Sequence, residues 1–563
     1  MKRLRDGRTP DRGAQPGPGA WRPSSLILLV SCWLALAGNM PLWRTVWPLP
    51  ELAGGRGGLF AVGIFVWIVA ALTMLLSLLA WKRVLKPVLL LLLLIAAASS
   101  YFMLQYAVVI DATMMANVAN TDAREVRDLL SWPLLFNIVV IAVLPGWWLL
   151  RQQIVLRRWW PQLLRNLGGA VAALMVVMVV TLLSFQDLAS LMRNHKQVRY
   201  LVNPINTLYA TGKLAADWLP HASRVMQPIG LDAALGPTYV GAQRTPLVVL
   251  VIGETARAAN FSLGGYARKT NPELEQIAAG GTALTYYSAV RSCGTNTQAS
   301  LPCMFSHLEK PEHDASRQPH ENLLDVLQHA GLAVLWIDNQ SGCKGLCDRV
   351  AYVDTFGQKT PGLCADGECF DEVLLVDLDQ RIAALDPARR ARGVVLVLHQ
   401  MGSHGPAYYR RSPPAFKKFM PECASNVLQD CPREELVNAY DNTLAYTDHV
   451  VAGVVHWLAA KAATGAHDTA MVYVSDHGES LGENNLYLHG LPYALAPATQ
   501  THVPMLSWVS EPMATRLSLR PACLRQNAAA PLSHDNLFHA MLGLLDVQTG
   551  LYQRELDWFA ACR

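Results

Sequence analysis

The sequence predicts a two-part protein, in which an N-terminal domain of five transmembrane helices precedes an α/β domain with a largely parallel sheet. Three observations support this prediction. Long apolar runs are confined to the part before about residue 190, strand-like and helical segments alternate after about residue 243, and ten of the eleven cysteines follow residue 290. We expect four segments, namely a disordered tail, a transmembrane domain, a helical linker and the α/β domain, at residues 1–24, 25–186, 187–243 and 244–563.

Five apolar runs approach the ~20 residues that a helix needs to cross a bilayer. They cover residues 25–43, 59–80, 86–107, 133–150 and 167–185. Lysine and arginine gather before the first run, between the second and third, and after the fourth, so the positive-inside rule places these loops in the cytoplasm. The odd number of spans then leaves everything after about residue 190 on the outer side of the membrane.

Two alternatives to this topology stay open. The five runs could be buried core helices, and the Ala-Leu-Ala sequence at 35–37 could be a signal-peptide cleavage site. Cleavage would remove the first run, but the four remaining spans would still leave the C-terminal part on the outer side.

The ten late cysteines are even in number and mostly lie in close pairs, which indicates disulfides formed in an oxidising compartment. The sequence leaves their connectivity open, and short-range pairing is the simplest choice. It predicts the bridges Cys293–Cys303, Cys343–Cys347, Cys364–Cys369 and Cys423–Cys431, with Cys523–Cys562 as the leftover pair. A zinc ribbon is the alternative, although the CKGLC segment has no matching second pair of cysteines.

Strand-like runs alternate with helical segments in the last 320 or so residues. The expected strands lie near 247–252, 333–338, 394–399, 471–475 and 502–509. The clearest helix covers 434–462, where apolar residues recur every three or four positions. This alternation implies a largely parallel sheet with helices on both faces. The net charge of +4 comes with no basic stripe interleaved with aromatic residues, so nucleic-acid binding finds no support.

Side chains that can bind metals follow three of the strand-like runs. Glu254 ends LVVLVIG, Asp476 and His477 follow MVYVS, and His399 and His404 follow VVLVL. In a parallel α/β sheet, ligands bind beyond the carboxyl ends of the strands. We therefore expect these side chains to lie close together.

A candidate nucleophile, Thr297, lies in the segment CGTNTQASLPC. A threonine hydroxyl must be activated by a base or a metal, and a divalent ion also neutralises charge on a transferred phosphoryl group. Glu254, Thr297, Asp476 and His477 would supply three oxygens and one nitrogen, a set that suits zinc, with manganese as the lesser alternative. The sequence therefore predicts a metal-centred phosphoryl-transfer site.

Three further residues join this prediction. His404 and His489 could bind a second ion or contact phosphoryl oxygens, and Lys344 in GCKG could add positive charge. Each candidate also has a structural interpretation, such as helix capping for Thr297 or a strand-to-turn cap for Asp476. The joint arrangement, rather than any one residue, supports the chemistry.

Seven segments of the chain resemble those of the lipid A phosphoethanolamine transferases, a family that includes the mobile colistin-resistance enzymes. Five lie in the α/β domain and two in the membrane part: VIGETAR, CGTNTQASLPCMFS, GCKGLCDRV, HQMGSHGPAYY, VSDHGESLGENNLYLHG, IDATMMANVANTDAREVRDLL and FQDLASLMRNHKQVRYLVNP. The resemblance implies the fold of alkaline phosphatases and sulfatases for the α/β domain. The sequence departs from the family pattern in its longer basic, Pro-rich tail and at Gln340-Ser341.

The resemblance also implies roles for individual residues. The family's zinc ligands fall on Glu254, Thr297, Asp476 and His477, with one zinc tightly bound and a second left open. The nucleophile falls on Thr297 rather than on Thr295.

Other matched positions imply contacts with the substrate. Lys344, His404 and His489 match residues that contact substrate phosphate or a second zinc, and Ser341 beside the lysine is assigned to substrate binding. Positions assigned to the ethanolamine head group are Asn117, Thr121 and Glu125. Their spacing of four and four places these three on one helical face, where the Glu125 carboxylate could pair with an ammonium group.

The implied protein is a monomeric, multi-pass transferase of the bacterial inner membrane with its catalytic domain in the periplasm. Thr297 would take phosphoethanolamine from phosphatidylethanolamine and pass it to a phosphate of lipid A. The added ammonium would weaken binding of cationic peptides such as polymyxin.

Three alternative functions remain at this point. The acceptor could be another envelope glycan, such as the lipopolysaccharide core or periplasmic glucans. A sulfatase is disfavoured because its formylglycine motif is absent around Thr297. A non-catalytic lipid sensor is disfavoured because every metal ligand is present.

Overall fold

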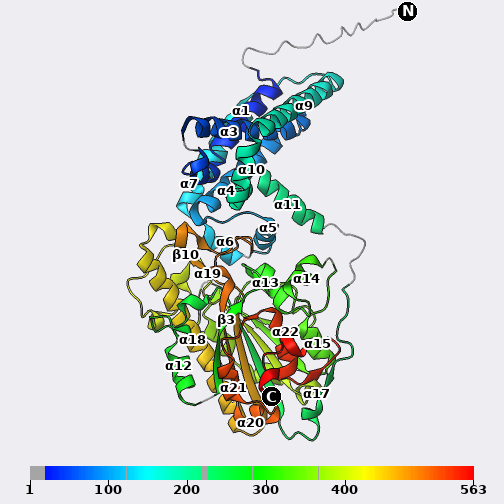
Figure 1. The fold of residues 1–563 in the computed structure, drawn as a ribbon, viewed down its shortest axis with the longest axis vertical. Helices are drawn as coiled ribbons and strands as arrows, with labels where there is room; N and C mark the ends of the chain where they lie inside the picture. Colours follow the sequence, from blue (N-terminus) through cyan, green and yellow to red (C-terminus); the bar gives the residue numbers. More distant parts are fainter. Residues whose placement is uncertain are drawn as a thin grey trace, which may run out of the picture. The chain divides into compact units, whose positions relative to one another are not determined.

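The computed structural model describes residues 20–563 apart from residues 53, 122, 219–225, 282, 317 and 366 (Figure 1). The chain forms two compact units, which are described separately. Unit 1 comprises the residues up to Leu104 and Trp132–Tyr209, and unit 2 comprises Gln105–Ser131 and Ala210–Arg563. Unit 2 is therefore discontinuous and includes a segment that the continuous ranges expected from the sequence assign to the membrane domain. Of the expected tail, residues 1–19 lie outside the described residues, and the first helix begins at Pro23.

The regular elements in the described part of unit 1 are helices, apart from an isolated β-bridge between Trp21 and Ile154. The helices that begin in it are α1 (Pro23–Leu36), α2 (Met40–Val46), η1 (Pro50–Leu52), α3 (Gly54–Leu78), α4 (Leu85–Tyr106), α7 (Trp132–Ile138), η2 (Val139–Val143), α8 (Leu144–Arg151), α9 (Trp159–Leu183), α10 (Phe185–Asn194), η3 (Lys196–Leu201) and α11 (Ile205–Trp218). Among the described residues, four stretches are long and apolar enough to cross a membrane, namely α3, α4, the Trp132–Arg151 stretch and α9. The bent pair of α1 and α2 makes a fifth when it counts as one span, which agrees with the predicted apolar helical domain.

The first predicted span is not one straight helix. Its two parts, α1 and α2, meet at an angle of 49°. Pro41 lies in the first turn of α2, where the missing N–H group needs no partner. The Asn39 side chain donates a hydrogen bond of 2.8 Å to the Leu34 carbonyl, which the end of α1 leaves without a helical donor.

An eight-stranded sheet forms the centre of unit 2, in the order β13-β3-β12-β9-β2-β8-β4-β5. Its strands are β2 (Thr245–Gly253), β3 (Ala283–Arg291), β4 (Ala333–Asp338), β5 (Ala351–Asp354), β8 (Val394–His399), β9 (His467–Ser475), β12 (His502–Val509) and β13 (Leu532–Ser533). The run from β9 through β2, β8 and β4 to β5 is parallel, whereas β12 is antiparallel to both β9 and β3. The carboxyl ends of β9, β2, β8 and β4 therefore meet at one edge of the sheet.

Helices cover both faces of this sheet (Figure 1). The helices of unit 2 are α5 (Ala112–Ala119), α6 (Ala123–Leu129), α12 (Pro272–Ala279), α13 (Thr297–Met304), α14 (Lys310–Ala315), α15 (Leu323–His329), α16 (Leu378–Ala383), α17 (Pro387–Arg390), α18 (Arg433–Ala463), α19 (Ala498–Thr501), α20 (Glu511–Arg516), α21 (Pro521–Gln526) and α22 (Asp535–Leu544), of which α5 and α6 belong to the Gln105–Ser131 segment. Helix α18 contacts β9 and β2 and is itself contacted by α12. On the other face, Val248, Leu250 and Ile252 of β2 share a buried core with residues of α13, α15 and α22.

Shorter elements complete unit 2. The two-stranded pairs are β1 (Ala234–Leu235) with β14 (Val547–Gln548), β6 (Cys364–Ala365) with β7 (Glu368–Cys369), and β10 (Ser480–Leu481) with β11 (Tyr487–Leu488). Short helical turns are η4 (Pro237–Tyr239), η5 (Ala258–Asn260), η6 (Ser262–Gly264), η7 (Asp371–Leu375), η8 (Tyr408–Arg410), η9 (Pro414–Phe416), η10 (Leu428–Asp430), η11 (Glu483–Asn485), η12 (Arg554–Leu556) and η13 (Ala560–Cys562).

The structure confirms the predicted α/β architecture. All five predicted strands are present as β2, β4, β8, β9 and β12, and the predicted long helix is α18. The predictions did not include β3, β5 or β13, nor the reversed direction of β12. All five predicted disulfides are also present: Cys293–Cys303, Cys343–Cys347, Cys364–Cys369, Cys423–Cys431 and Cys523–Cys562.

Candidate metal centre

The predicted metal ligands meet where β2 and β9 end. These strands pair in parallel with Gly253 opposite Ser475, so the next residues, Glu254 and Asp476, leave the sheet side by side. The Asp476 amide donates a hydrogen bond of 2.9 Å to the Gly253 carbonyl, which extends the pairing by one step. His477 follows directly, and Glu254, Asp476 and His477 are all fully buried.

Four side chains converge at this point. His477 Nε2 lies 3.3 Å from Glu254 Oε1 and 3.4 Å from Asp476 Oδ2. Thr297 Oγ1 lies 3.0 Å from Glu254 Oε2 and 3.5 Å from His477 Nε2. The structure therefore brings together all four residues that the sequence assigned to a metal.

Thr297 is the first residue of α13, and its neighbours explain why its hydroxyl faces the cluster. The Asn296 side chain caps the helix by accepting a hydrogen bond of 2.9 Å from the Ala299 amide, so Thr297 is not needed for capping. The Thr295 hydroxyl points elsewhere and donates to the Leu491 carbonyl at 2.6 Å. Of these two threonines, only Thr297 presents its hydroxyl to the carboxylates.

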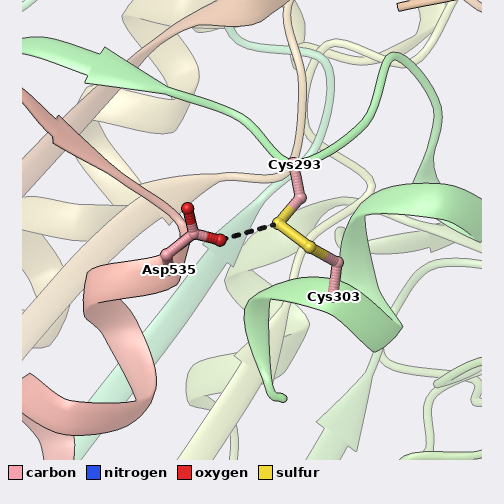
Figure 2. Close-up of side chains that lie close together, drawn as sticks. All are labelled: Cys293, Cys303 and Asp535. Atoms are coloured by element: carbon pink, nitrogen blue, oxygen red, sulfur yellow. Dashed lines mark hydrogen bonds between the residues drawn. A yellow bond between two sulfur atoms is a disulfide. The ribbon is translucent and has the colours of Figure 1, made fainter. Parts of the chain in front are cut away.

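A disulfide holds the loop that carries Thr297 (Figure 2). Cys293 follows β3, Cys303 lies in α13, and the bridge between them spans a sequence separation of 10 that includes Thr297. An Asp535 oxygen lies 3.8 Å from Cys293 Sγ. The same oxygen accepts a hydrogen bond of 2.8 Å from the Lys310 amide, so this carboxylate links the start of α22 to the start of α14.

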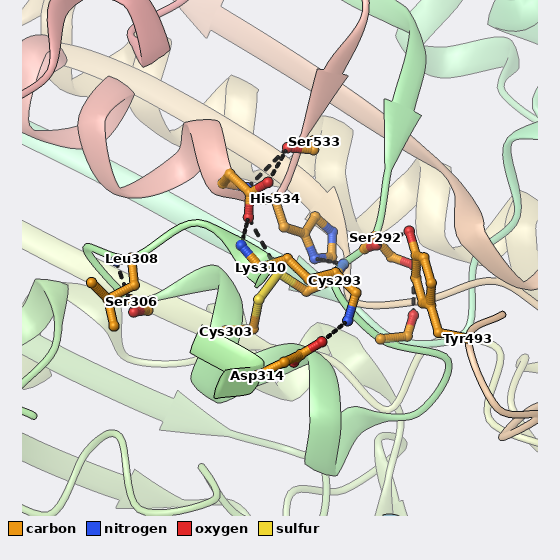
Figure 3. The surroundings of a disulfide bond; sticks show 12 residues. Ser292, Cys293, Cys303, Ser306, Leu308, Lys310, Asp314, Tyr493, Ser533 and His534 are labelled. Atoms are coloured by element: carbon orange, nitrogen blue, oxygen red, sulfur yellow. Dashed lines mark hydrogen bonds and ion pairs between the residues drawn. A yellow bond between two sulfur atoms is a disulfide. The ribbon is translucent and has the colours of Figure 1, made fainter. Parts of the chain in front are cut away.

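His534 supports the same loop from the other side (Figure 3). Its Nδ1 accepts a hydrogen bond of 3.1 Å from the Cys293 amide, and its Nε2 donates at 3.0 Å to the carbonyl of Ser475, the residue before Asp476. One buried neutral imidazole thus connects the threonine loop to the end of β9. Burial lowers the pKa of His534 to about 4, as expected for a ring whose Nδ1 must stay unprotonated to accept a hydrogen bond.

The buried ligands perturb one another strongly. Burial would raise the pKa of Glu254, but the hydrogen bond and charge of His477 hold it well below its usual range. Burial and the adjacent Glu254 charge raise the pKa of Asp476 to about 7. Burial would lower the pKa of His477, yet the Asp476 and Glu254 carboxylates raise it to about 10. The negative charge of the two carboxylates therefore favours a cation at this point, either a proton on His477 or a divalent metal ion.

The cluster fits a zinc ion. Asp476 Oδ2 is buried without a hydrogen-bond partner, which is costly for a carboxylate unless a cation binds it. The donor set of two carboxylates, one imidazole and one hydroxyl belongs to the nitrogen- and oxygen-rich sites that zinc prefers. Two other cysteine-acid groupings, around Cys293 and Cys343, consist of disulfide-bonded cysteines and offer no thiolates. Among the described residues, the Glu254 cluster remains the candidate metal site.

Two predicted histidines lie beside the cluster. The His489 ring centroid is 4.2 Å from that of His477 and 6.0 Å from that of His404. Sequence reasoning missed the group that orients His489, which is Glu479. Its Oε1 lies 3.3 Å from His489 Nδ1, and its Oε2 accepts a hydrogen bond of 3.0 Å from the Tyr408 hydroxyl. The position of Glu479 in the same DHGES segment as Asp476 was an available signal.

The His399 imidazole, noted at a strand end, forms a pair behind the cluster. Its Nδ1 lies 3.0 Å from Asp338 Oδ2, and both residues are fully buried. Trp336 donates a hydrogen bond of 2.8 Å to the same oxygen. Burial would lower the pKa of His399, but Asp338 raises it, with smaller contributions from the Glu254 and Asp476 charges. The pair with Asp338 thus favours the protonated form of His399 behind the Glu254 cluster.

The three predicted head-group residues lie in the Gln105–Ser131 segment, but the prediction that they share one helical face is wrong. Asn117 lies in α5 and Glu125 in α6, and Thr121 lies in the connection where the helix is interrupted. Helix α5 contacts α13, the helix that begins with Thr297. In α6, Glu125 Oε1 lies 3.7 Å from His404 Nε2. Thr121 and Asn117 are half-buried, and the Thr121 hydroxyl donates a hydrogen bond of 2.9 Å to the Asn117 carbonyl.

Lys344 and Ser341 form a separate pair. The Lys344 ammonium donates to the Ser341 carbonyl at 3.0 Å and to its hydroxyl at 2.8 Å. Both residues lie in the loop after β4 that the Cys343–Cys347 disulfide closes. Among the described residues, the hydrogen bonds of Lys344 go to Ser341 and not to the metal cluster. The predicted contact of Lys344 and Ser341 with the substrate therefore stays a prediction.

Comparisons with known proteins agree with this geometry. A family model described as phosphoethanolamine transferase EptA/EptB matches residues 68–219, and the Sulfatase family model matches residues 246–547. The chain is 39% identical over 546 residues to phosphoethanolamine transferase EptA of Salmonella typhimurium, covering 95% of this chain and 96% of that protein. It is 37% identical over 539 residues to phosphatidylethanolamine transferase Mcr-1 of Escherichia coli, covering 93% and 95%. The integral membrane lipooligosaccharide phosphoethanolamine transferase A of Neisseria meningitidis superposes with a TM-score of 0.89 at 36% identity, covering 96% and 99%.

Proposed function

We propose that this chain, which belongs to the phosphoethanolamine transferase family, moves phosphoethanolamine from phosphatidylethanolamine to a phosphate of lipid A. The observation that carries the proposal is the convergence of the Thr297 hydroxyl on Glu254, Asp476 and His477. The relatives support lipid A modification in general, and the apolar helices support a multi-pass protein of the inner membrane. The catalytic unit would lie in the periplasm, which suits its five disulfides.

Thr297 would act as the nucleophile. Its oxygen attacks the phosphorus of phosphatidylethanolamine and loses its proton, the bond from phosphorus to the diacylglycerol oxygen breaks, and that oxygen takes up a proton. In the second step an oxygen of the lipid A phosphate attacks the same phosphorus, the bond from phosphorus to the Thr297 oxygen breaks, and that oxygen takes up a proton to restore the hydroxyl. The position of Thr297 at the start of α13 supports this role, because amide N–H groups at a helix N-terminus attract phosphoryl oxygens.

A zinc ion held by Glu254, Asp476, His477 and Thr297 would lower the proton affinity of the threonine hydroxyl and offset negative charge on the phosphoryl oxygens. The Thr297 oxygen is oriented by a residue of the chain itself. Glu254 accepts the Thr297 hydroxyl hydrogen bond and so aims its oxygen.

The donor head group would be recognised through its two charges. Glu125 and His404 are 3.7 Å apart and would face the ammonium and the phosphate, respectively. The half-buried Asn117 in α5 and Thr121 in the connection between α5 and α6 would supply hydrogen bonds at the rim. Masking a lipid A phosphate with an ammonium would reduce negative surface charge and weaken the binding of polymyxin.

Mass spectrometry of lipid A from cells expressing the protein tests the proposal. We expect lipid A that carries one added phosphoethanolamine, and no addition in cells expressing Thr297→Ala at equal protein level. If lipid A is unmodified and phosphoethanolamine is found on core sugars or periplasmic glucans, that glycan, and not lipid A, is the acceptor. No modified envelope component at all would refute the activity.

A further inference from the structure

We infer that Arg411 is a positioning residue that sets the separation between the Glu125 carboxylate and the His404 imidazole. The inference rests on the proposed function, because it assigns these two groups to the ends of the donor head group. Arg411 lies between the two segments that carry them. Its side chain is only 4% exposed, so its contacts are shielded from water.

Arg411 holds the His404 segment and the Glu125 segment at the same time. Its Nε donates a hydrogen bond of 3.1 Å to the backbone carbonyl of His404. Its Nη2 pairs with Asp128 Oδ2 in α6, where Asp128 is 2% exposed. Glu125 and Asp128 are three residues apart in the same helix and therefore lie on neighbouring positions of one face.

The rest of the surroundings make this connection rigid. The remaining Arg411 nitrogen, Nη1, lies 3.2 Å from Glu368 Oε2 in the Cys364–Cys369 hairpin. The Asn426 side chain donates a hydrogen bond of 2.7 Å to the Asp128 carbonyl from inside the Cys423–Cys431 loop. Two disulfide-closed loops thus support the ends of the arginine–aspartate pair. A planar guanidinium with fixed donor directions transmits such geometry better than a flexible ammonium would.

The chemistry explains why the separation matters. The ammonium and phosphate of phosphoethanolamine are joined by a two-carbon chain, so the groups that receive them must stay a fixed distance apart. A shift of α6 would leave the phosphate in place and misplace the ammonium, which weakens donor binding more than the chemical step.

Arg410 provides a matched control. It is the neighbouring residue and also pairs with Asp128, with Nη1 3.3 Å from Oδ1. However, its side chain is 45% exposed, so water screens its charge. Removing Arg410 changes the same carboxylate's surroundings without cutting the link to the His404 carbonyl.

The test uses the full chain in vesicles of phosphatidylethanolamine and phosphatidylglycerol with lipid A as acceptor. We expect Asp128→Asn to raise KM for phosphatidylethanolamine about tenfold and to change kcat less than about threefold, as for a loss of ground-state binding. Arg411 keeps Glu368 as a partner in this variant, so the fold should persist. Arg410→Gln should leave KM within about twofold of the wild-type value. Equal effects of Asp128→Asn and Arg410→Gln would overturn the inference.

A double-mutant cycle separates positioning from general damage. In a Glu125→Gln background the head-group carboxylate is already lost, so adding Asp128→Asn should change KM by less than about twofold. Full additivity of the two changes would overturn the positioning role. If Asp128→Asn fails to fold, Arg411→Lys replaces it in the double-mutant cycle. Lysine keeps the positive charge but loses the several fixed N–H donors of the guanidinium. Absence of transfer by the wild-type protein would instead refute the proposed function itself, whatever the variants do.

Discussion

Replacing Thr297 by alanine separates catalysis from stability, and Thr295 supplies the matched control two residues away. The two hydroxyls are alike in chemistry and burial, with both residues 4% exposed. They differ in direction, because Thr297 faces Glu254 whereas Thr295 donates to the Leu491 carbonyl.

The structure predicts comparable losses of stability for the two variants and very different losses of transfer. Thr297→Ala removes a hydrogen bond of 3.0 Å to the buried Glu254 carboxylate, a loss of about 1.5–3 kcal/mol in stability. Thr295→Ala removes a hydrogen bond of 2.6 Å and leaves a carbonyl without that donor, a loss of about 1–2 kcal/mol. Transfer separates the two variants, because Thr297→Ala deletes the oxygen of the proposed nucleophile. We expect its rate to fall at least about a thousandfold, or about 4 kcal/mol in activation free energy.

The assay is mass spectrometry of the protein after incubation with phosphatidylethanolamine and no acceptor. The wild-type chain and Thr295→Ala should each gain one phosphoethanolamine group on the peptide that contains Thr297. Thr297→Ala should gain none, while its thermal unfolding stays close to that of Thr295→Ala. An adduct on Thr297→Ala that is lost in Thr295→Ala would move the nucleophile by two residues. Transfer with no adduct in any variant would refute the two-step mechanism.

The remaining predictions concern the metal, the disulfide and pH. Glu254→Ala and Asp476→Ala should each lower the zinc content of the purified full chain, measured by mass spectrometry of the metal, together with activity; full activity of metal-free protein would contradict this. Replacing Cys293 and Cys303 together by serine should lower unfolding free energy by about 3 kcal/mol, because the bridge closes a loop with a sequence separation of 10, and unchanged thermal unfolding would contradict it. The buried His534, with its pKa lowered to about 4 against an unfolded value of 6.5, should contribute stability above pH 6.5 that is lost as pH falls to 4, about 3 kcal/mol in total. The unfolding free energy, measured with urea between these pH values, should therefore change less with pH in His534→Gln than in the wild-type protein. The same change with pH in both proteins would assign the pH dependence to other groups.

The strands that could be predicted from the sequence are those in which nearly every residue is buried and the apolar run is therefore uninterrupted. Strands β4 and β8 are buried at every position, and β2 and β9 at all but the first. The missed strands lack this signal. In β5 three of the four residues are exposed, and β13 has only two residues, so their pairing depends on a neighbour already in place. The direction of β12 could not be predicted either, because apolar patterning is the same for both directions.

The clustering of Glu254, Asp476 and His477 could be predicted because a topological rule connects their places in the sequence to the edge of the sheet. Residues that follow adjacent parallel strands must emerge together, and Glu254 and Asp476 do so after β2 and β9. Thr297 follows β3, which runs in the same direction as β9 and ends at the same edge of the sheet, but β3 was not among the predicted strands. Its selection over Thr295 came from the resemblance to the family. The physical reason appears only in the structure, where Asn296 takes the capping role and leaves the Thr297 hydroxyl available.

No comparable rule predicts the residues that position the Glu125 and His404 side chains. Asp128 and Arg411 are 283 residues apart, and in the sequence each reads as an ordinary charge beside other charges. Their significance arises because folding buries both and directs a second Arg411 nitrogen to the His404 carbonyl. Burial makes an unpaired charge costly, so the pair constrains the segments it joins more strongly than an exposed pair would. The clustering of side chains at strand ends can thus be inferred from local sequence. The distance between Glu125 and His404 instead depends on contacts between residues that are far apart in the sequence.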